Sequence, residues 1–172
     1  MWETAILVRS IMEFYLKKNA PDEAIAIMKE VAAWAREKGF RAWKDEWLTK
    51  EKLVTQEAPE EDFCVGLVDG EPACCMILQW VDTEYWPDAP KYEAGYLHKV
   101  CVRRPYAGTG LLKCLVDYAR KEALEHGSRF LRLDTGWDNP KVRPLYEALG
   151  FQLVKKLEFP NGGAMALYEL EI

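Results

Sequence analysis

The order of apolar and polar residues along the chain predicts strands separated by turn residues. Short runs rich in β-branched and aromatic residues either alternate with polar positions or stay continuously apolar, as strands of a partly buried sheet do. Asp69-Gly70 is a two-residue hairpin turn between the first two runs, and the segment 160–163 separates the last two. The predicted strands are 63–68, 73–80, 96–102, 129–135, 151–159 and 164–171.

A second spacing, with apolar residues three and four positions apart, predicts helices between these strands. Proline marks the start of two of them, at Pro21 and directly after Asn139, and glycine marks their ends. The predicted helices are 21–39, 111–127 and 139–150, with a shorter one near 49–54. Residues 4–17 are expected to be extended, and 82–93 to form a loop.

This order of elements predicts a mixed α/β fold, with a mostly antiparallel twisted sheet and helices on both faces. The length of 172 residues suits one domain over 1–172. The strand-helix-strand unit over 96–135 should be a right-handed crossover between parallel strands, and it is the centre of the predicted fold.

Charge and composition restrict the partners. Lys and Arg number 23 and Asp and Glu 28, a net charge of −5 without any basic block. This balance argues against nucleic acid or an anionic membrane as partner and suits a cationic amine. No run approaches membrane-spanning length, and Met1-Trp2-Glu3 lacks the basic start of a signal peptide, so we expect a cytoplasmic protein.

The five cysteines have two interpretations. They form no C-x-x-C pair and lie in apolar patterns, which favours small buried hydrophobic residues in a reducing compartment. The alternative is a nucleophilic Cys101 in the central strand. Strict alternation would turn Cys101 away from the face that carries Tyr96, His98 and Val100.

The turn between the central strand and the following helix carries the clearest chemistry. Gly108 and Gly110 precede a helix that begins at Leu111, so unpaired N–H groups and the positive end of the helix dipole make a phosphate site. A P-loop would need Lys-Ser/Thr after the last glycine, where Leu111-Leu112 stands. A dinucleotide fingerprint would need a third glycine at Lys113.

The order V-x-x-x-Y-x-G-x-G at the head of an amphipathic helix resembles the coenzyme A motif of the GNAT superfamily of N-acetyltransferases, in its bacterial form. R-F-L-R-L-D-T, Asn139 and L-Y-E-A-L-G-F resemble the rest of that family's cofactor half, and A-A-W-A-R-E-K-G-F resembles its first helix. Two positions depart from the family pattern, because Ala107 replaces the usual Arg or Gln and Leu112 the usual Gly or Ala. Backbone N–H groups would supply the remaining contacts.

The resemblance implies that acetyl-CoA is the co-substrate, without a metal, and that the strands of the crossover splay apart to admit it. N–H groups near Val100 to Val102 would hold the acetyl carbonyl. The implied cofactor-binding residues are Val100, Cys101, Val102, Ala107, Gly108, Thr109, Gly110, Leu111, Leu112, Asn139 and Tyr146. Asn139 has a second reading as the cap of a helix at Pro140.

Two residues are implied to move protons. Tyr146 stands where related enzymes carry a general-acid tyrosine, with aromatic packing as the alternative. His98 matches one histidine of a strand, H-L-H-A-L-A-V, in family members whose histidines relay the amine proton through water, and Tyr96 replaces the other. The alternative for His98 is a hydrogen-bonded core residue.

The acceptor side is less defined. Tryptophans near predicted loops could form an aromatic pocket for an amine, or pack loops or a homodimer interface; these are Trp43, Trp47, Trp80, Trp86 and Trp137. Acidic residues of the 82–93 loop could attract a cation or only be solvated. We therefore expect acetyl transfer to a small-molecule primary amine, the alternative being a non-catalytic acyl-CoA-binding sensor or structural module.

Overall fold

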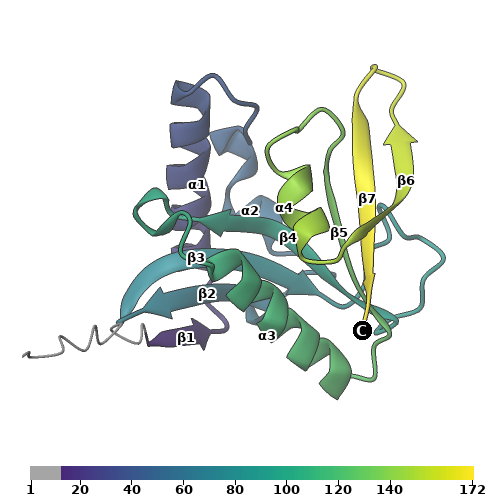
Figure 1. The fold of residues 1–172 in the computed structure, drawn as a ribbon, viewed down its shortest axis with the longest axis horizontal. Helices are drawn as coiled ribbons and strands as arrows, with labels where there is room; N and C mark the ends of the chain where they lie inside the picture. Colours follow the sequence, from purple (N-terminus) through teal and green to yellow (C-terminus); the bar gives the residue numbers. More distant parts are fainter. Residues whose placement is uncertain (1–12) are drawn as a thin grey trace, which may run out of the picture.

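The computed structural model describes residues 13–172 and contains one strongly twisted sheet (Figure 1). The expected extended segment over 4–17 is described only from residue 13, where it contains one short strand. In the described part of the chain seven strands follow the order β1-β2-β3-β4-β5-β7-β6. They are β1 (Phe14–Lys17), β2 (Phe63–Val68), β3 (Glu71–Gln79), β4 (Ala94–Val102), β5 (Phe130–Gly136), β6 (Gln152–Glu158) and β7 (Ala164–Glu171).

The pairing confirms the predicted sheet. β4 and β5 are parallel, and every other neighbouring pair is antiparallel. The β2–β3 hairpin turns at Asp69 and Gly70, both with positive φ, as a tight two-residue turn requires. In Figure 1 the β6–β7 hairpin stands at a steep angle to β1–β3, which is the accumulated twist of the sheet.

The helices are α1 (Pro21–Glu37), α2 (Lys50–Leu53), α3 (Leu111–Glu125) and α4 (Arg143–Ala148). Single 3-10 turns lie at Asp45–Trp47, Glu60–Asp62 and Arg104–Tyr106. The predicted start of the fourth helix at Asn139-Pro140 is wrong. Pro140 lies in a turn, and Pro144 occupies the first turn of α4, where a missing N–H costs nothing.

The two faces of the sheet carry separate cores. α1 packs its apolar side, including Ile27 and Met28, against Cys75, Ile77 and Cys101. On the opposite face the buried stripe of α3 packs against β3, β4 and β5. α4 adds Tyr146 to this second core, so that α4 lies beside the ends of the two parallel strands (Figure 1).

Candidate active site

The two parallel strands separate part-way along their length. Pairing between β4 and β5 runs from Ala94 and Phe130 to Leu97 and Leu133, and stops there. β4 continues along β3 to Val102, whereas β5 continues along β7 to Gly136. The facing backbone groups beyond Leu97 and Leu133 therefore have no strand partner on that side. This gap is the predicted splay, and His98 and Asp134 are the first residues at its mouth.

A β-bulge in β4 lies directly at the gap. Cys75 pairs with Cys101 and Ile77 with His98, so that the single residue Met76 faces two residues, Lys99 and Val100. Lys99 takes the left-handed backbone conformation, with φ of +51°. A bulge shifts the alternation by one residue. The expectation that Cys101 points away from His98 is therefore wrong: both lie on the α1 face, with their partners Cys75 and Ile77.

His98 lies between two carboxylates. Its Nε2 is 3.1 Å from Oδ2 of Asp82, in the loop after β3, and its Nδ1 is 3.4 Å from Oδ1 of Asp134 on β5. The side chains of Asp82 and Asp134 are only 5% and 13% exposed. The contact between Oδ2 and Nε2 lacks the alignment of a hydrogen bond, and neither buried atom has another partner.

Burial and charge act differently on the two carboxylates. Burial favours a higher pKa for Asp82, but His98 and the N–H groups of Tyr85 and Glu84 outweigh it, so the pKa lies below its ordinary value. Burial raises the pKa of Asp134 despite the attraction of His98. Asp82 is therefore the more firmly ionised of the two, and Asp134 holds a proton more readily.

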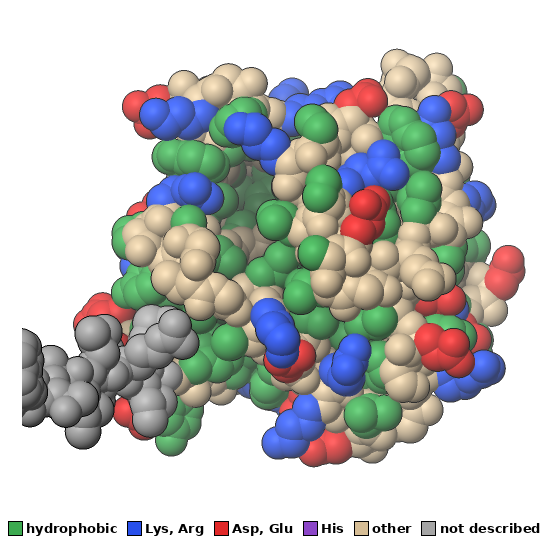
Figure 2. Space-filling view, in the orientation of Figure 1, with side chains coloured by type: hydrophobic (Ala, Val, Ile, Leu, Met, Phe, Trp, Pro, Cys, Tyr) green, Lys and Arg blue, Asp and Glu red, His purple; other side chains and the backbone are tan. Residues whose placement is uncertain are grey.

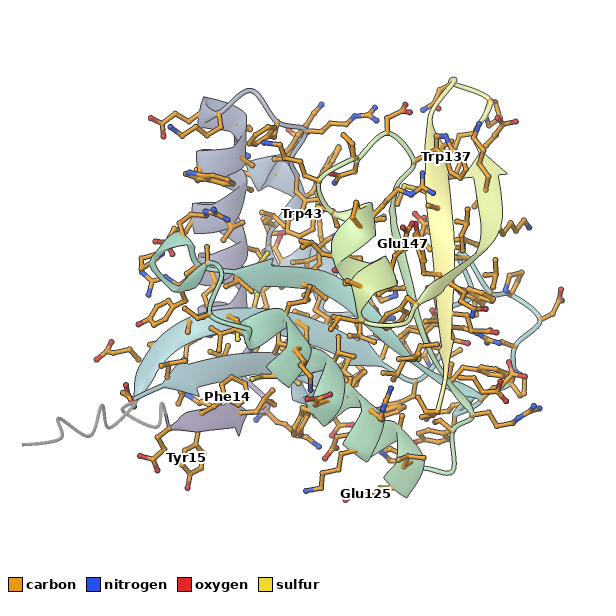
Figure 3. The ribbon with its side chains drawn as sticks, in the orientation of Figure 1. Phe14, Tyr15, Trp43, Glu125, Trp137 and Glu147 are labelled. Atoms are coloured by element: carbon orange, nitrogen blue, oxygen red, sulfur yellow. The ribbon has the colours of Figure 1, made fainter. Side chains whose placement is uncertain are left out.

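Lys99 completes the polar surroundings of the gap. Its Nζ lies 4.8 Å from the centre of the Trp43 ring, and burial lowers its pKa. Figure 2 shows a hollow on this face of the molecule with hydrophobic side chains inside it, in the region between α1 and α4. Trp43 lies between these helices in the same view (Figure 3). The sequence-based reasoning had not singled out Lys99.

The glycine turn has the form predicted for an anion site. Gly108 and Gly110 have positive φ, of +73° and +87°, and Gly110 directly precedes the first residue of α3. A Cβ built on either glycine would meet no atom within 4 Å, so the space above the main chain is open. Thr109 bends back to the carbonyl of Tyr106, and the N–H groups of the first turn of α3 point out of the helix. This cradle fits the diphosphate of coenzyme A.

Side chains around the turn are mostly engaged elsewhere. Ala107 and Thr109 are exposed, Leu111 is buried, and Leu112 packs against the core of the α3 face. Arg103 is paired with Glu30 at 2.6 Å and donates to the carbonyl of Pro72. The groups of the turn that are free to bind a ligand are therefore mainly its backbone N–H groups.

Tyr146 and Asn139 lie on the segment after β5. Tyr146 is 8% exposed, packs edge-on against Phe151, and has its pKa raised by burial. Asn139 does not cap α4. Its carbonyl accepts from the N–H groups of Val142 and Arg143, and its half-buried side chain stands beside Gly136 at the end of β5.

The structure does not gather the five tryptophans into one pocket. Trp80 packs on His126 and Trp86 covers Arg132. Trp137 lies beyond α4, beside β7, where Arg143 stacks on it (Figure 3). Trp47 is exposed beside Lys44. Trp43 is the one that contacts a residue of the central gap, through Lys99.

The acidic residues of the 82–93 loop have different surroundings. Asp82 faces His98, whereas Glu93 is paired with the buried Arg132 at 2.8 Å. Arg132 also donates to the hydroxyl of Tyr96, which fixes Tyr96 as a structural residue. Glu84 and Asp88 are exposed. Of this set, Asp82 is the carboxylate next to His98.

Asp134 is the residue that sequence reasoning missed most clearly. A signal was available, because His98 and Asp134 are each the first polar residue after a buried leucine on the two strands of the crossover. Parallel register brings such positions side by side.

A separate hollow of about 640 Å³ lies at the β5–α4 turn, lined by Trp137, Asp138, Pro140, Arg143, Pro144 and Glu147. It contains none of the residues around His98.

Comparison with known proteins identifies this arrangement. The acetyltransferase (GNAT) family matches residues 28–151, which include the gap, the glycine turn and Tyr146. The chain belongs to this family. The predicted resemblance is therefore confirmed, as is the mixed fold that it implied.

The GNAT chain is similar to proteins from several bacteria and archaea. It is 24% identical over 135 residues to the uncharacterised N-acetyltransferase YesJ of Bacillus subtilis, covering 74% of each chain. A GNAT acetyltransferase structure from Listeria monocytogenes superposes with a TM-score of 0.72 and 25% identity, over 94% of this chain and 96% of that one. The PaiA N-acetyltransferase of Thermoplasma acidophilum, solved with coenzyme A, has a TM-score of 0.68 and 17% identity, over 94% and 100%.

None of the helices in residues 13–172 has the length and apolar character that a bilayer crossing demands.

Proposed function

We propose that the protein transfers the acetyl group of acetyl-CoA to the primary amine of a small molecule, by direct attack while both substrates are bound. The observation that carries the proposal is the gap between β4 and β5, which brings His98 and Asp134 to the path between the glycine turn and the hollow beside Trp43. GNAT membership supplies the class of reaction.

The cofactor side is assigned to the main chain. N–H groups of Gly108 to Leu112 hold the diphosphate, and those within Val100 to Val102 that are directed away from β3 stabilise negative charge on the acetyl oxygen. Acetyl-CoA supplies the acetyl group as a thioester, and the chain supplies position, a proton acceptor and a proton donor.

The proton movements are assigned to His98 and Tyr146. An alkylammonium with a pKa of about 10 must lose a proton before its nitrogen can attack, and His98 takes that proton. The nitrogen then bonds to the acetyl carbon, the carbon–sulfur bond breaks, and Tyr146 protonates the departing thiolate. The amide nitrogen releases its second proton to solvent, and the proton held by His98 returns to Tyr146 through solvent, so that both residues are restored and one proton is liberated overall.

The alternative is a non-catalytic acyl-CoA-binding module. Such a module needs the glycine turn but does not need His98 and its two carboxylates. A binder has no use for a histidine held between two buried carboxylates at the end of the cofactor path. The acceptor site is also sheltered, since His98 is 19% exposed, which favours a slender amine over a bulky one.

A homodimer stays a prediction, supported by exposed Leu145 on α4 and Leu153 and Val154 on the edge strand β6.

A screen of primary amines with acetyl-CoA, following release of the free thiol, tests the proposed function. It should include alkylamines, arylalkylamines and a short peptide with a free N-terminus. We expect thiol release with one class of small amine, together with thermal stabilisation by acetyl-CoA. Stabilisation without acceleration by any amine would favour the binding module, and acceleration by the peptide alone would contradict the small-molecule acceptor.

A further inference from the structure

Asp82 is held in place before any substrate arrives. Its Oδ1 accepts the N–H of Tyr85 at 3.1 Å, and its carbonyl accepts the N–H of Trp86 at 2.9 Å. The next residue, Thr83, donates through both its N–H and its hydroxyl to Glu57. These bonds leave Oδ2 of Asp82 as the free oxygen, buried and directed at His98.

The charge of Asp82 favours one form of the His98 imidazole, although the contact is not aligned as a hydrogen bond. An oxygen of an ionised carboxylate 3.1 Å from Nε2 is attracted when Nε2 carries the hydrogen and repelled when Nε2 carries a lone pair. In the neutral ring the lone pair then lies on Nδ1. Nδ1 is thus the nitrogen able to accept a proton, and it is the one on the side of Asp134.

Nδ1 and Oδ1 of Asp134 form an incomplete pair. The two atoms are 3.4 Å apart, and in this form of the ring both are acceptors. Two acceptors at this distance repel each other unless they share a proton, a cation that donates to both, or a metal ion that both coordinate. The higher proton affinity of Asp134 agrees with the first arrangement in the free protein. An alkylammonium supplies the second, because its nitrogen carries several donors.

We propose that the acceptor ammonium binds beside this pair and donates to both Oδ1 of Asp134 and Nδ1 of His98, while Asp82 holds the Nε2–H form of the ring as a positioning residue. The inference rests on the proposed function and names its substrate class, a cationic alkylamine. On binding, one N–H proton passes from the ammonium to Nδ1, and the nitrogen lone pair becomes free to attack. Asp82 stays ionised and stabilises the resulting imidazolium. Asp134 holds the ammonium beforehand.

The other charged groups near the His98 ring are compatible with these roles of Asp82 and Asp134. Glu84 and Tyr85 belong to the Asp82 loop, and Lys99 follows His98 on β4. Lys99 contributes a positive charge that the ammonium must tolerate, and burial lowers its pKa, which weakens that repulsion. Asp82, Asp134 and Glu84 together leave the site favourable to a cation.

Kinetics with two kinds of acceptor test the roles of Asp82 and Asp134. An alkylamine must lose a proton before attack, whereas an arylamine such as aniline is already neutral at pH 7.5. Asp82→Asn should lower kcat for the alkylamine by roughly 10²–10⁴ and leave kcat for the arylamine almost unchanged. Asp134→Asn should raise KM for the alkylamine alone. Asp22→Asn, which removes an exposed carboxylate of α1, is the matched control.

If Asp82 has only a structural role, Asp82→Asn should lower kcat for the alkylamine and for the arylamine alike. That outcome would overturn the proposal. The wild-type protein separates this failure from failure of the proposed function. If it stabilises with acetyl-CoA but acetylates no amine, the enzyme assignment fails, and the ring form is still measurable. The chain has two histidines, His98 and His126, so long-range ¹H–¹⁵N spectra resolve both, and His126→Gln assigns them.

We expect His98 in the Nε2–H form in the wild-type protein and a mixture of forms in Asp82→Asn, with His126 unchanged. An identical His98 spectrum in the two proteins would contradict the positioning role, whatever the kinetics. Retained stabilisation of Asp82→Asn by acetyl-CoA shows that the variant is folded. If the variant does not fold, the wild-type spectrum decides, because an Nδ1–H form there is incompatible with the proposal.

Discussion

Cys101 lies on the same face of the sheet as His98, although three positions separate them along one strand. The cause is the extra residue of the bulge, which places Lys99 and Val100 opposite the single residue Met76. Cys101 packs with Cys75 in the core beside α1, and the pKa of Cys75 is raised by burial. The orientation of Cys101 therefore does not argue against a nucleophile, but its 3% exposure does.

Cys101→Ala should keep turnover within a few-fold of the wild-type value, because a sulfur inside the core does not reach substrate. A modest loss of stability is expected from the lost packing. Initial rates at varied concentrations of both substrates should give intersecting lines, and mass spectrometry without an acceptor should detect no acetylated protein. Parallel lines, or an acetyl group on wild-type protein that is absent from Cys101→Ala, would restore the nucleophile.

The bulge in β4 is a feature that the sequence did not predict. Period-two alternation predicted the strands and their hairpins because a strand buried on one face alternates apolar and polar residues along its own sequence. A bulge depends on the register between two strands, and residues 96–102 alone do not record it. The start of α4 was predicted wrongly for a related reason. Pro140 and Pro144 both suit a first helical turn, and tertiary packing decides between them. The glycine turn was predictable because positive φ selects glycine directly.

Asp82 shows the same limit for the site. His98 and Tyr146 stand in recognisable local motifs, and the resemblance located them. The partners of His98 come from a loop and from another strand, far from it in the sequence, so that only the fold brings them within 3.5 Å.

Gly110→Glu should abolish stabilisation by acetyl-CoA. The built Cβ meets no atom within 4 Å, so the side chain fits the free protein, at roughly 1 kcal/mol for the left-handed conformation. Its carboxylate then occupies the cradle and repels the diphosphate. Melting temperatures with and without saturating acetyl-CoA measure the effect, and Gly39→Glu, another open glycine of positive φ, is the control. A shift equal to that of the wild-type protein would remove the cradle from the cofactor site.

Tyr146→Phe should lower kcat by roughly 10²–10⁴ and leave the affinity for acetyl-CoA unchanged, since only the hydroxyl is lost. Burial raises the pKa of Tyr146, so its hydroxyl stays protonated through the neutral range and can give a proton to a thiolate. Tyr118→Phe, on α3, is the matched control. Turnover of Tyr146→Phe comparable to that of Tyr118→Phe would assign Tyr146 to packing alone.

Gly66→Ala should destabilise the edge of the sheet. A Cβ at this position would lie 2.4 Å from Sγ of Cys74 and 2.7 Å from the ring of Phe14. Relieving such overlap costs about 1–3 kcal/mol, which urea unfolding measures. In a double-mutant cycle, Gly66→Ala should cost less in a Cys74→Ala background, because one of the two obstacles is gone. Equal costs in both backgrounds would mean that Phe14 alone sets the limit.

Asp62 gives the stability a pH dependence of its own. The residue is 7% exposed, and burial raises its pKa to about 7, with Glu61 adding to the effect and Lys91 and Lys18 opposing it. In the unfolded chain the same carboxyl titrates near 3.8. Between these values the folded state binds more protons than the unfolded state, so this contribution is full below the unfolded pKa and is lost as pH rises through about 7.

Asp62→Asn keeps the shape of the protonated acid and cannot ionise, so the variant should escape that loss. The difference in melting temperature, variant minus wild type, should be small near pH 4 and grow in favour of the variant up to pH 8. Asp22→Asn, an exposed residue, should give a difference that does not rise over this range. A constant or falling difference for Asp62→Asn would mean that the carboxylate finds compensation in the folded protein, and that its burial does not shape the pH dependence.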